Sequence, residues 1–476
     1  MRHLRDLRAY VDALDELGEL QHIDAEVSLD YELGAIVRRS YDLMAPAPLF
    51  TNMTGVEPGF RVLGAPAGVS AQPGLYLSRV ALSLGLPPHT SGSDIVAALV
   101  AARGAPPIPP RVVPTGPCKE VIALGDDIDL GRLPAPLLHG HDGGRFINTY
   151  GIVVARTPDG SWTNWSISRT QWLDARRMRS LVIPTQHIGV IRAMWQERGE
   201  DMPIAVAMGV EPVIPFVGGM PLPEGVNEAD FIGAYLGEPV DVVRCETVDL
   251  EVPATAEIVI EGEILPGVRE PEGPFGEFTG YFSRRSTEHV FVAKAVAMRE
   301  RPWFQSIGSG RAGDHITTLG LIREAEIANA LGRVIPNVRG VHVPLSGTSS
   351  FTAYVSITQG RPGEAKHVIP IVLGVDHYLK LVIVVDDDID VFDESEVLWA
   401  VATRMQADRD LVVIGGSLGA MLDPSADERG VTAKLGIDAT RPFGEAFAEK
   451  LVMPADKMAW ARSLVDRLSR GQEARV

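Results

Sequence analysis

Residues 271–281 read PEGPFGEFTGY, a segment that sets two acids among prolines and glycines. Proline has no backbone N–H and glycine adopts unusual dihedral angles, so this composition excludes a helix and predicts turn or extended backbone. The carboxylates of Glu272 and Glu277 are thereby confined to a rigid loop. Two acids at fixed places in such a loop indicate a site, and a pair of solvated loop acids is the alternative.

The chain around this loop is rich in short strand patterns. Residues 118–300 contain apolar, β-branched runs separated by Gly and Pro, among them Ile204–Met208, Ala256–Glu261 and Val290–Arg299. Frequent short strands with turn signals between them predict a barrel or a sandwich-like domain. The preceding stretch 104–117, GAPPIPPRVVPTGP, is interpreted as a linker, because proline fits neither a helix interior nor a central strand.

Residues after 300 alternate between two patterns. Arg323–Leu331 and Glu394–Met405 have helical patterns, whereas Phe351–Thr358 and Lys380–Val385 have the composition of strands. Strand and helix in alternation predict an α/β domain. The last amphipathic stretch, Pro454–Leu468, predicts a helix that packs on its own chain or on a partner subunit.

The composition is typical of a soluble globular protein. Of 476 residues, 45% are hydrophobic and 22% are charged, and the formal charge of −18 disfavours a nucleic-acid partner. The N-terminus is amphipathic and no apolar run approaches the ~20 residues that span a bilayer, so we expect no signal peptide and no membrane segment. Cys118 and Cys245 lack metal-type spacing, which predicts reduced thiols in a cytoplasmic protein.

Three separated residues form a candidate metal set. Asn164, His187 and Glu228 offer oxygen and imidazole donors, which suit Mn²⁺ or Mg²⁺ better than a thiolate-preferring ion. They are scattered over 64 positions, so their spacing alone is poor evidence for a metal site. Taken singly, a histidine such as His187 is more often structural, and a glutamate such as Glu228 more often caps the helix that begins there. A metal-dependent hydrolase that activates water at these residues is one interpretation of the set.

Arg169 is a candidate partner for the two loop acids. It ends the Trp- and Ser-rich segment Asn164-Trp-Ser-Ile-Ser-Arg169 rather than lying in a charged one. A guanidinium matches a carboxylate bidentately. Two nearby carboxylates with one arginine between them tend to split in pKa, one held ionised and the other available protonated, which general acid–base catalysis needs. A surface cation is the alternative for Arg169.

Two further features lie at the ends of the predicted strand 380–385. Lys380 is the first residue of this strand. Its side chain either contacts a phosphate or extends from the edge of the strand into water. Asp386–Asp388 and Asp390 follow the strand and invite a Ca²⁺ or Mg²⁺ interpretation. The spacing lacks the glycine and the distal glutamate of a calcium loop, so we predict a solvated strand end.

Taken together, these segments resemble those of the UbiD family of reversible decarboxylases, which depend on prenylated FMN. The likeness covers most of the chain in the family's order, and its joint occurrence is more specific than any single motif. The matching segments are Trp162-Thr-Asn-Trp-Ser-Ile-Ser-Arg169, Ile183-Pro-Thr-Gln-His-Ile188, Glu228 after Gly-Val-Asn, Val252-Pro-Ala-Thr-Ala-Glu-Ile-Val-Ile-Glu261, Pro271-Glu-Gly-Pro-Phe-Gly-Glu277 and Asp376-His-Tyr-Leu-Lys380.

The resemblance implies an α/β (α+β) fold in which a central flavin-binding split β-barrel lies between two α/β regions. We expect the N-terminal α/β region at residues 1–110, the prenylated-FMN-binding barrel at 111–305, a C-terminal α/β dimerisation domain at 306–445 and a C-terminal helix at 446–476. The resemblance also implies a homodimer, in some members assembled into a hexamer.

The resemblance also implies which residues bind the cofactors. A divalent ion, usually Mn²⁺, would be held by Asn164, His187 and Glu228 and would bridge to the cofactor phosphate, with Lys380 adding charge from the other side. A potassium ion, held largely by backbone carbonyls, is common in the family. The residues expected at the modified flavin are Asn164, Trp165, Ser166, Ile167, Ser168, Arg169, Gln186, His187, Glu228 and Lys380.

The implied activity is the removal of CO₂ from an α,β-unsaturated or (hetero)aromatic carboxylic acid through a covalent adduct with prenylated FMN. Arg169 would hold the substrate carboxylate, Glu272 would fix the geometry of Arg169, and Glu277 would deliver the proton that replaces CO₂. A flavin prenyltransferase would supply the cofactor. The substrate, and the choice between a cycloaddition and a simpler adduct, stay open.

Two alternatives belong to other functional classes. One is the metal-dependent hydrolase, and the other is a non-catalytic flavin-binding protein, which would need neither Arg169 nor its two acids. For the substrate pocket we expect Ile183, residues 311–319 and residues 435–443 to contribute walls.

Overall fold

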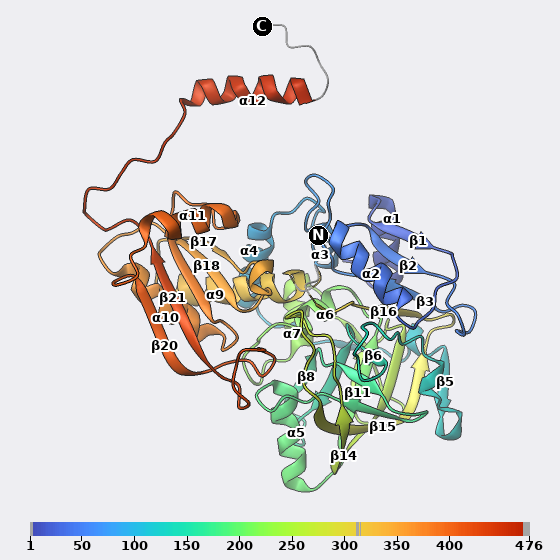
Figure 1. Cartoon of the computed structure of the whole chain (residues 1–476). Helices are drawn as coiled ribbons and strands as arrows, with labels where there is room; N and C mark the ends of the chain where they lie inside the picture. The colour runs from blue at the N-terminus through green and yellow to red at the C-terminus, as the bar shows by residue number, and fades with distance from the viewer. Residues whose placement is uncertain (1–2, 311–313, 315, 470–476) are drawn as a thin grey trace.

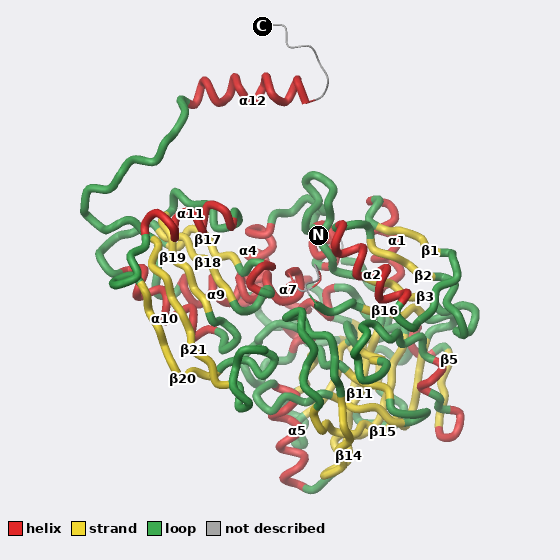
Figure 2. Tube along the Cα trace, in the orientation of Figure 1, coloured by secondary structure: helices red, strands yellow, loops and turns green. Residues whose placement is uncertain are grey.

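The computed structural model describes residues 3–310, 314 and 316–469. Figure 1 shows three regions, which meet near the middle of the molecule, and a C-terminal helix that stands apart from them. The strands gather in separate sheets, most clearly in the central and C-terminal regions (Figure 2). This mixture of helices and strands in several domains confirms the predicted fold class.

The N-terminal region is a four-stranded sheet with helices packed on it. The amphipathic helix α1 buries Leu7, Tyr10 and Leu14 against this sheet, and Asp6 caps its first turn by accepting a hydrogen bond from the N–H of Ala9. The sheet order is β1 (Leu20–Ile23), β2 (Ala47–Phe50), β3 (Arg61–Gly64) and β16 (Trp303–Ser306). The helices of this region are α1 (Leu7–Leu17), α2 (Glu32–Leu43) and α3 (Ser78–Ser83), whereas α4 (Gly92–Arg103) buries Ile95 and Leu99 in the core of the central region. The last strand comes from far along the chain, so the end of the central region is tied to the N-terminal one.

The central region is a nine-stranded sheet that curls into a half-barrel (Figure 2). Ile152 and Val154 of β7 face one hydrophobic core, and Val153 and Ala155 face another. A sheet buried on both faces explains why its strands are continuous apolar runs. The strands are β5 (Val121–Leu124), β6 (Phe146–Asn148), β7 (Ile152–Arg156), β8 (Thr163–Ser166), β9 (Thr170–Trp172), β10 (Arg177–Ser180), β11 (Met202–Met208), β14 (Ile258–Glu272) and β15 (Ser286–Met298).

Three helices and a small sheet accompany the half-barrel. The helices are α5 (His187–Arg198), α6 (Val213–Gly218) and α7 (Glu228–Leu236), and the sheet joins β13 (Glu251–Pro253), β12 (Asp241–Arg244) and β4 (Arg111–Val112). Strand β4 lies inside the stretch predicted to be a linker, which corrects that prediction. Prolines on both sides confine it to two residues at the sheet edge, where proline is tolerated.

The C-terminal region is the predicted α/β domain. Its five strands lie in the order β17 (Val338–His342), β18 (Thr352–Ile357), β19 (Leu381–Asp386), β21 (Val431–Ala439) and β20 (Leu411–Leu418). Helices α9 (Leu321–Gly332) and α10 (Glu364–Val375) bury their apolar sides with one face of the sheet, and α11 (Glu394–Arg404) with the other. β18, β19 and β21 are parallel, as α/β connections require.

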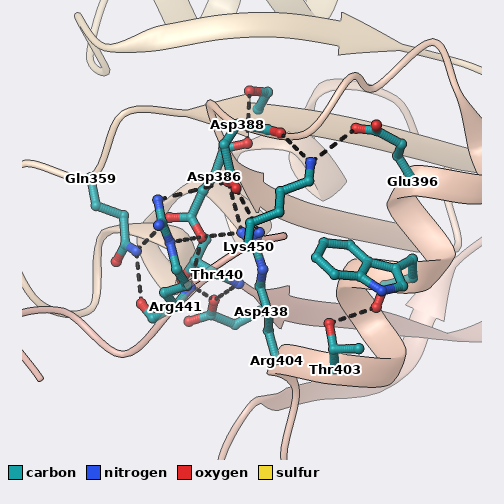
Figure 3. Close-up of polar contacts among 12 residues, drawn as sticks. Gln359, Asp386, Asp388, Glu396, Thr403, Arg404, Asp438, Thr440, Arg441 and Lys450 are labelled. Carbon is teal, nitrogen blue, oxygen red and sulfur yellow. Dashed lines mark hydrogen bonds and ion pairs between the residues drawn. The ribbon is translucent and has the colours of Figure 1, made fainter. Parts of the chain in front are cut away.

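The acidic end of β19 is only in part the solvated strand end that the sequence predicts, because Asp387 and Asp390 are exposed whereas Asp386 and Asp388 pair with a buried arginine. Asp386 is 4% exposed, and the buried guanidinium of Arg404 donates to Asp386 Oδ2 at 2.6 Å and to both carboxylate oxygens of Asp388 at 2.9 and 2.8 Å (Figure 3). The backbone N–H of Arg441 donates to Asp386 Oδ2 at 2.7 Å. Two acids here compensate a buried arginine that comes from α11, and only the fold brings it to them.

The chain ends in an arm that leaves the C-terminal domain. Lys450 fixes the start of the arm by donating to the carbonyl of Asp388 at 3.1 Å (Figure 3). Helix α12 (Ala455–Ser469) stands away from the three domains (Figure 1). Apolar side chains along the arm are exposed, with Leu451 at 99% and Trp460 at 57%.

In the part of the chain that the structure describes, no helix has both the length and the apolar character needed to cross a membrane. Cys118 and Cys245 are free thiols. Burial raises the pKa of Cys118 to about 12, so this thiol is unreactive near neutral pH.

Candidate active site

A cavity of about 460 Å³ lies between the half-barrel and the C-terminal domain. Its volume falls within the range of small-molecule sites, about 300–1,000 Å³. One wall comes from the segment around β8 and from the loop after β14, and the other from α9 and from the loop between α10 and β19. The predicted residues that line it are Asn164, Ser166, Ile167, Ser168, Arg169, Gln186, His187, Glu228 and Glu277.

Arg169 and the two loop acids form one buried cluster. Arg169 Nε donates to Glu272 Oε1 at 2.8 Å and Nη2 donates to Glu272 Oε2 at 2.9 Å, which is a bidentate pair. Nη1 of the same guanidinium donates to Glu277 Oε1. Arg169, Glu272 and Glu277 are 9%, 1% and 7% exposed. The guanidinium therefore lies between two carboxylates that are shielded from bulk water.

The backbone of the glycine- and proline-rich loop explains these positions. Glu272 is the last residue of β14 and pairs with Ser286 across the hairpin, which fixes its side chain. Gly276 approaches the ring of His139 so closely that a Cβ would meet Nδ1 at 2.6 Å. Glu277 then opens a tight turn in which the N–H of Gly280, at φ +84°, donates to the carbonyl of Glu277 at 3.0 Å. The turn directs Glu277 back toward the strand that carries Glu272.

A third acid lies beside this cluster. Glu288 is on β15, two residues beyond the partner of Glu272, and it is 8% exposed. Burial raises the pKa of Glu288, and the negative charge of Glu272 adds to that rise. The sequence analysis missed Glu288, because its neighbourhood follows from strand register and from no motif.

Asn164, Glu228 and His187 also come together, although 64 positions separate the first and the last of them in the chain. Asn164 Nδ2 donates to Glu228 Oε1 at 2.9 Å, and His187 Nδ1 lies 3.8 Å from the same oxygen. Glu228 Oε2 accepts the N–H of Trp165 at 2.7 Å. Asn164 and Glu228 are 1% and 2% exposed. The structure thus brings the predicted metal set to one end of the cavity.

This set has the chemistry of a hard-cation site. Asn164 Oδ1 is buried and has no hydrogen-bond partner among the described residues. A buried oxygen without a donor costs free energy unless it binds something, and a divalent cation would satisfy it together with Glu228 and the imidazole. The set contains an amide; among the described residues, no three His, Cys, Asp or Glu side chains gather as a metal cluster.

The N-terminus of α5 opens onto the same end of the cavity. Gln186 is the N-cap residue of this helix, its side chain makes no cap hydrogen bond, and Thr185, Gln186 and His187 line the cavity. The first N–H groups of a helix lack intrahelical acceptors and carry partial positive charge, so they favour an anion such as a phosphate.

Three predicted cofactor or catalytic residues do not line the cavity. Trp165 is 2% exposed and packs in a hydrophobic core, and Glu272 lies behind Arg169. Lys380 Nζ forms an ion pair with Asp423 at 2.6 Å and donates to Ser425 Oγ at 2.6 Å. The structure therefore gives no support to a phosphate contact by Lys380, whose charge is already paired.

The expected pocket walls are met in part. Ile183, Thr318 and Leu319 line the cavity. Residues 311–313 and 315 of the expected wall lie outside the described residues. Residues 435–443 do not line the cavity, and Leu422 does so instead. Strand β21 occupies most of 435–443 inside the C-terminal sheet, so the loop after β20 reaches the cavity in its place.

The wall from the C-terminal domain carries charged and aromatic groups that the sequence analysis did not single out. Arg323, Asp376, His377 and Tyr378 all line the cavity. Arg323 Nε donates to Asp376 Oδ2 at 2.8 Å. Burial lowers the pKa of His377 and raises that of Tyr378, so both side chains are neutral near pH 7. Asp376, His377 and Tyr378 open a segment that the sequence marked only for its family likeness.

Comparisons with known proteins agree with this geometry. The chain matches three family models, described as the N-terminal domain, the Rift-related domain and the C-terminal domain of 3-octaprenyl-4-hydroxybenzoate carboxy-lyase, over residues 11–99, 111–312 and 316–439. Together these models cover most of the chain in the order expected for one enzyme.

Individual proteins are similar over most of their length. The chain is 41% identical to pyrrole-2-carboxylic acid decarboxylase of Pseudomonas aeruginosa over 415 residues (85% of this chain, 84% of the relative). It is 36% identical to ferulic acid decarboxylase 1 of Saccharomyces cerevisiae over 418 residues (84% and 83%). A solved structure, an evolved dimeric form of the UbiD-class enzyme HmfF from Pelotomaculum thermopropionicum in complex with prFMN, superposes with a TM-score of 0.85 at 33% identity (97% of this chain, 100% of that chain). The chain belongs to the UbiD family of carboxy-lyases.

Proposed function

We propose that this chain removes CO₂ from an α,β-unsaturated or (hetero)aromatic carboxylic acid with prenylated FMN as its cofactor. The observation that carries the proposal is the cluster of Arg169, Glu272 and Glu277 at the wall of a cavity of about 460 Å³. The relatives are named as decarboxylases of a heteroaromatic and a cinnamic-type acid, which supports this substrate class.

The residues at one end of the cavity fit the phosphate of such a cofactor. Asn164, His187 and Glu228 would hold a divalent ion, Mn²⁺ in our proposal, and the open N-terminus of α5 would receive the phosphate. The side chains from Ser166 to Arg169, together with Gln186, would line the flavin. When bound, prenylated FMN supplies the electron sink for cleavage of the carbon–carboxylate bond.

Arg169 binds the substrate carboxylate in this proposal. Its side chain reaches the cavity and is rigid, because Glu272 holds Nε and Nη2 together. Glu272 is 1% exposed, so the pair is shielded from solvent and salt. A guanidinium fixed in this way orients a carboxylate without first losing its own rotational freedom.

Glu277 delivers the proton that replaces CO₂. Loss of CO₂ leaves an electron pair on the substrate carbon, and the carboxylic acid group of Glu277 protonates that carbon to C–H, so that one substrate carboxylate and one proton give one product and one CO₂. Glu277 lines the cavity and contacts the same guanidinium as Glu272.

One experiment tests the proposed function. The protein is purified after expression with and without a flavin prenyltransferase, its absorbance spectrum is recorded, and CO₂ release is measured from pyrrole-2-carboxylate, ferulate and cinnamate. We expect CO₂ only from the coloured preparation made with the prenyltransferase. Equal CO₂ release from both preparations, or none from any unsaturated or aromatic acid, contradicts the proposal.

The same experiment separates the two alternatives. A metal-dependent hydrolase at Asn164, His187 and Glu228 would be colourless and indifferent to flavin. A non-catalytic flavin-binding protein would be coloured and would release no CO₂. The buried cluster at Arg169 speaks against a carrier, because flavin binding requires no arginine held by two acids.

We further propose that the chain forms a homodimer through its C-terminal part. The arm that ends in α12 exposes Leu451, Trp460 and Val465 at 99%, 57% and 60%. Burial of these apolar side chains against a second chain lowers the free energy of the dimer relative to two separate chains. A hexamer, a potassium ion, supply by the prenyltransferase and a cytoplasmic location stay predictions. Light scattering of the full chain and of a chain that ends at Lys450 tests the dimer: a monomer in both contradicts it.

A further inference from the structure

A second guanidinium reaches the cavity from the wall opposite Arg169. Arg323 lies in the first turn of α9, its side chain is 11% exposed, and it lines the cavity together with Tyr378. The proposed function leaves this cation without a task. A guanidinium on the wall of a mostly apolar cavity is costly unless its N–H groups find acceptors, and Asp376 and the carbonyl of Leu319 supply only some of these.

Arg323 is held in the same way as Arg169. In each case a carboxylate accepts from Nε at 2.8 Å, Glu272 for Arg169 and Asp376 for Arg323. In each case the guanidinium lies over an aromatic ring that lines the cavity, 5.3 Å from the centroid of Phe275 and 5.1 Å from that of Tyr378. Such support fixes the plane of the guanidinium, which is what directional recognition of a carboxylate requires.

One edge of the Arg323 guanidinium is left available. Nε is taken by Asp376, and Nη1 donates to the carbonyl of Leu319 at 3.1 Å. Nη2 has no hydrogen-bond acceptor among the residues that the structure describes, and it is not one of the fully buried unsatisfied atoms. An N–H group that faces a cavity without an acceptor offers a contact to an anionic part of a ligand.

An aromatic surface connects the two arginines. Glu277 contacts Arg169, and the next residue, Phe278, lies with its ring centroid 6.2 Å from that of Tyr378, over which Arg323 sits. Phe278 also lines the cavity. Aromatic side chains that line the cavity therefore lie near both cations, and their flat faces suit a planar conjugated or aromatic ligand.

We propose that Arg323 binds a second carboxylate of the substrate, so that the preferred substrates are unsaturated or aromatic dicarboxylic acids. This inference rests on the proposed function. One carboxylate is lost as CO₂ at Arg169, while the other stays ionised at Arg323 and leaves with the product. One dicarboxylate and one proton give one monocarboxylate and one CO₂.

A purely structural role is the competing explanation for Arg323. The Arg323–Asp376 ion pair joins α9 to the segment before β19, and its loss would loosen that wall whatever the substrate. Loosening lowers the turnover of all acids alike. Recognition of a second carboxylate instead changes the preference between a dicarboxylic acid and the matched monocarboxylic acid. The ratio of their kcat/KM values therefore distinguishes the two explanations.

The test measures kcat/KM of the holoenzyme for two matched pairs: pyrrole-2-carboxylate with pyrrole-2,5-dicarboxylate, and cinnamate with 4-carboxycinnamate. In at least one pair we expect the dicarboxylate to be preferred tenfold or more. Arg323→Met should reduce that preference at least tenfold, mainly through KM, and Arg323→Lys should restore part of it. Arg333→Gln is the matched control, because this exposed arginine ends the same helix and lies outside the cavity lining; the preference should not change.

The possible outcomes are distinct. No dicarboxylate preference in the natural chain overturns the inference, and so does an equal loss for both members of each pair in Arg323→Met. If no acid releases CO₂, the proposed function fails, and calorimetry with the same acids then tests the site alone. Tighter binding of the dicarboxylate that is lost in Arg323→Met supports the inference, and equal binding overturns it. Thermal melting of each variant confirms that it is folded.

Discussion

The two walls of the cavity hold an arginine by the same means and differ in the acids around it. On the half-barrel wall Arg169 contacts Glu272 and Glu277, and Glu288 is buried close by. On the C-terminal wall Asp376 is the one acid that contacts Arg323 among the described residues, and the neutral groups His377 and Tyr378 lie beside it. In our proposals the half-barrel wall, with its additional acids, carries out the chemistry, and the C-terminal wall recognises a second carboxylate.

Removing the proton donor should have the largest effect. Glu277→Gln keeps the shape and the contact with Arg169 but cannot release a proton, so kcat should fall about 100- to 10,000-fold, the range of general acid catalysis. The flavin absorbance of the purified variant should not change. Steady-state product formation at the natural rate would remove Glu277 from its proposed role.

Loss of the metal set should come next. His187→Ala removes the imidazole beside Glu228 and should weaken metal binding about 10- to 100-fold, with loss of much of the bound flavin. Metal content by mass spectrometry and flavin absorbance report the change. His377→Ala is the control on the other wall, since its ring lines the cavity far from the metal set in the chain. Full metal and flavin content in His187→Ala would contradict the assignment.

The two acids that hold the arginines offer a direct comparison. Glu272→Gln breaks the bidentate pair with Arg169 and should lower kcat/KM for every acid about 10- to 100-fold. Asp376→Asn should act mainly through Arg323, because Asn retains an oxygen that can accept the N–H of Tyr378, and it should cost most for acids that carry a second carboxylate. Kinetics of both variants on the same matched acids decide the point. Equal losses from the two substitutions on all acids would remove the distinction between the walls.

The last prediction concerns the stability of the half-barrel at low pH and leaves activity at neutral pH unchanged. Burial lowers the pKa of His289 to about 4, and Arg269 donates to its Nε2 at 3.1 Å, so the folded state favours the neutral ring. The unfolded chain takes up a proton near pH 6.5 and the folded chain only near pH 4, so stability present above pH 6.5 is lost as the pH falls through this window. The loss amounts to at most about 3 kcal/mol.

Denaturant unfolding of the natural chain and of His289→Gln at pH 7 and pH 4.5 measures this effect. We expect a smaller loss of stability on acidification in the variant, which has no ring to protonate. The same loss in both proteins would show that other groups cause the acid sensitivity.

Local patterns were sufficient to predict many elements. The predicted helix at Arg323–Leu331 is α9 (Leu321–Gly332), and the predicted strand at Lys380–Val385 is β19 (Leu381–Asp386). Both carry a strong local signal, an amphipathic period in one case and a buried β-branched run in the other. The prediction that the proline-rich stretch 104–117 is only a linker was wrong, because the two-residue strand β4 forms by pairing with β12, more than a hundred residues away in the chain.

The wrong and missing predictions share a cause. Lys380 and Asp386 were judged by their neighbours in the chain, but their partners Asp423 and Arg404 come from other elements. Arg323 carried no motif, and only the packing of α9 against the segment before β19 brings it to the cavity. A charged residue acquires its role from the opposite charge it meets, and that meeting is long-range.

The sequence by itself determined the alternating and apolar patterns that form each element, the rigid backbone of the 271–281 loop, and the family likeness. The family likeness also predicted that Glu272 and Glu277 meet Arg169 and that Asn164 meets Glu228. Tertiary structure alone showed that Asp376 meets Arg323. Backbone preferences and the periodic spacing of hydrophobic residues act over a few residues, so they can be identified from the sequence. The pairing of buried charges depends on distance in space and on exclusion of water, and both arise only after the half-barrel and the C-terminal domain have packed together.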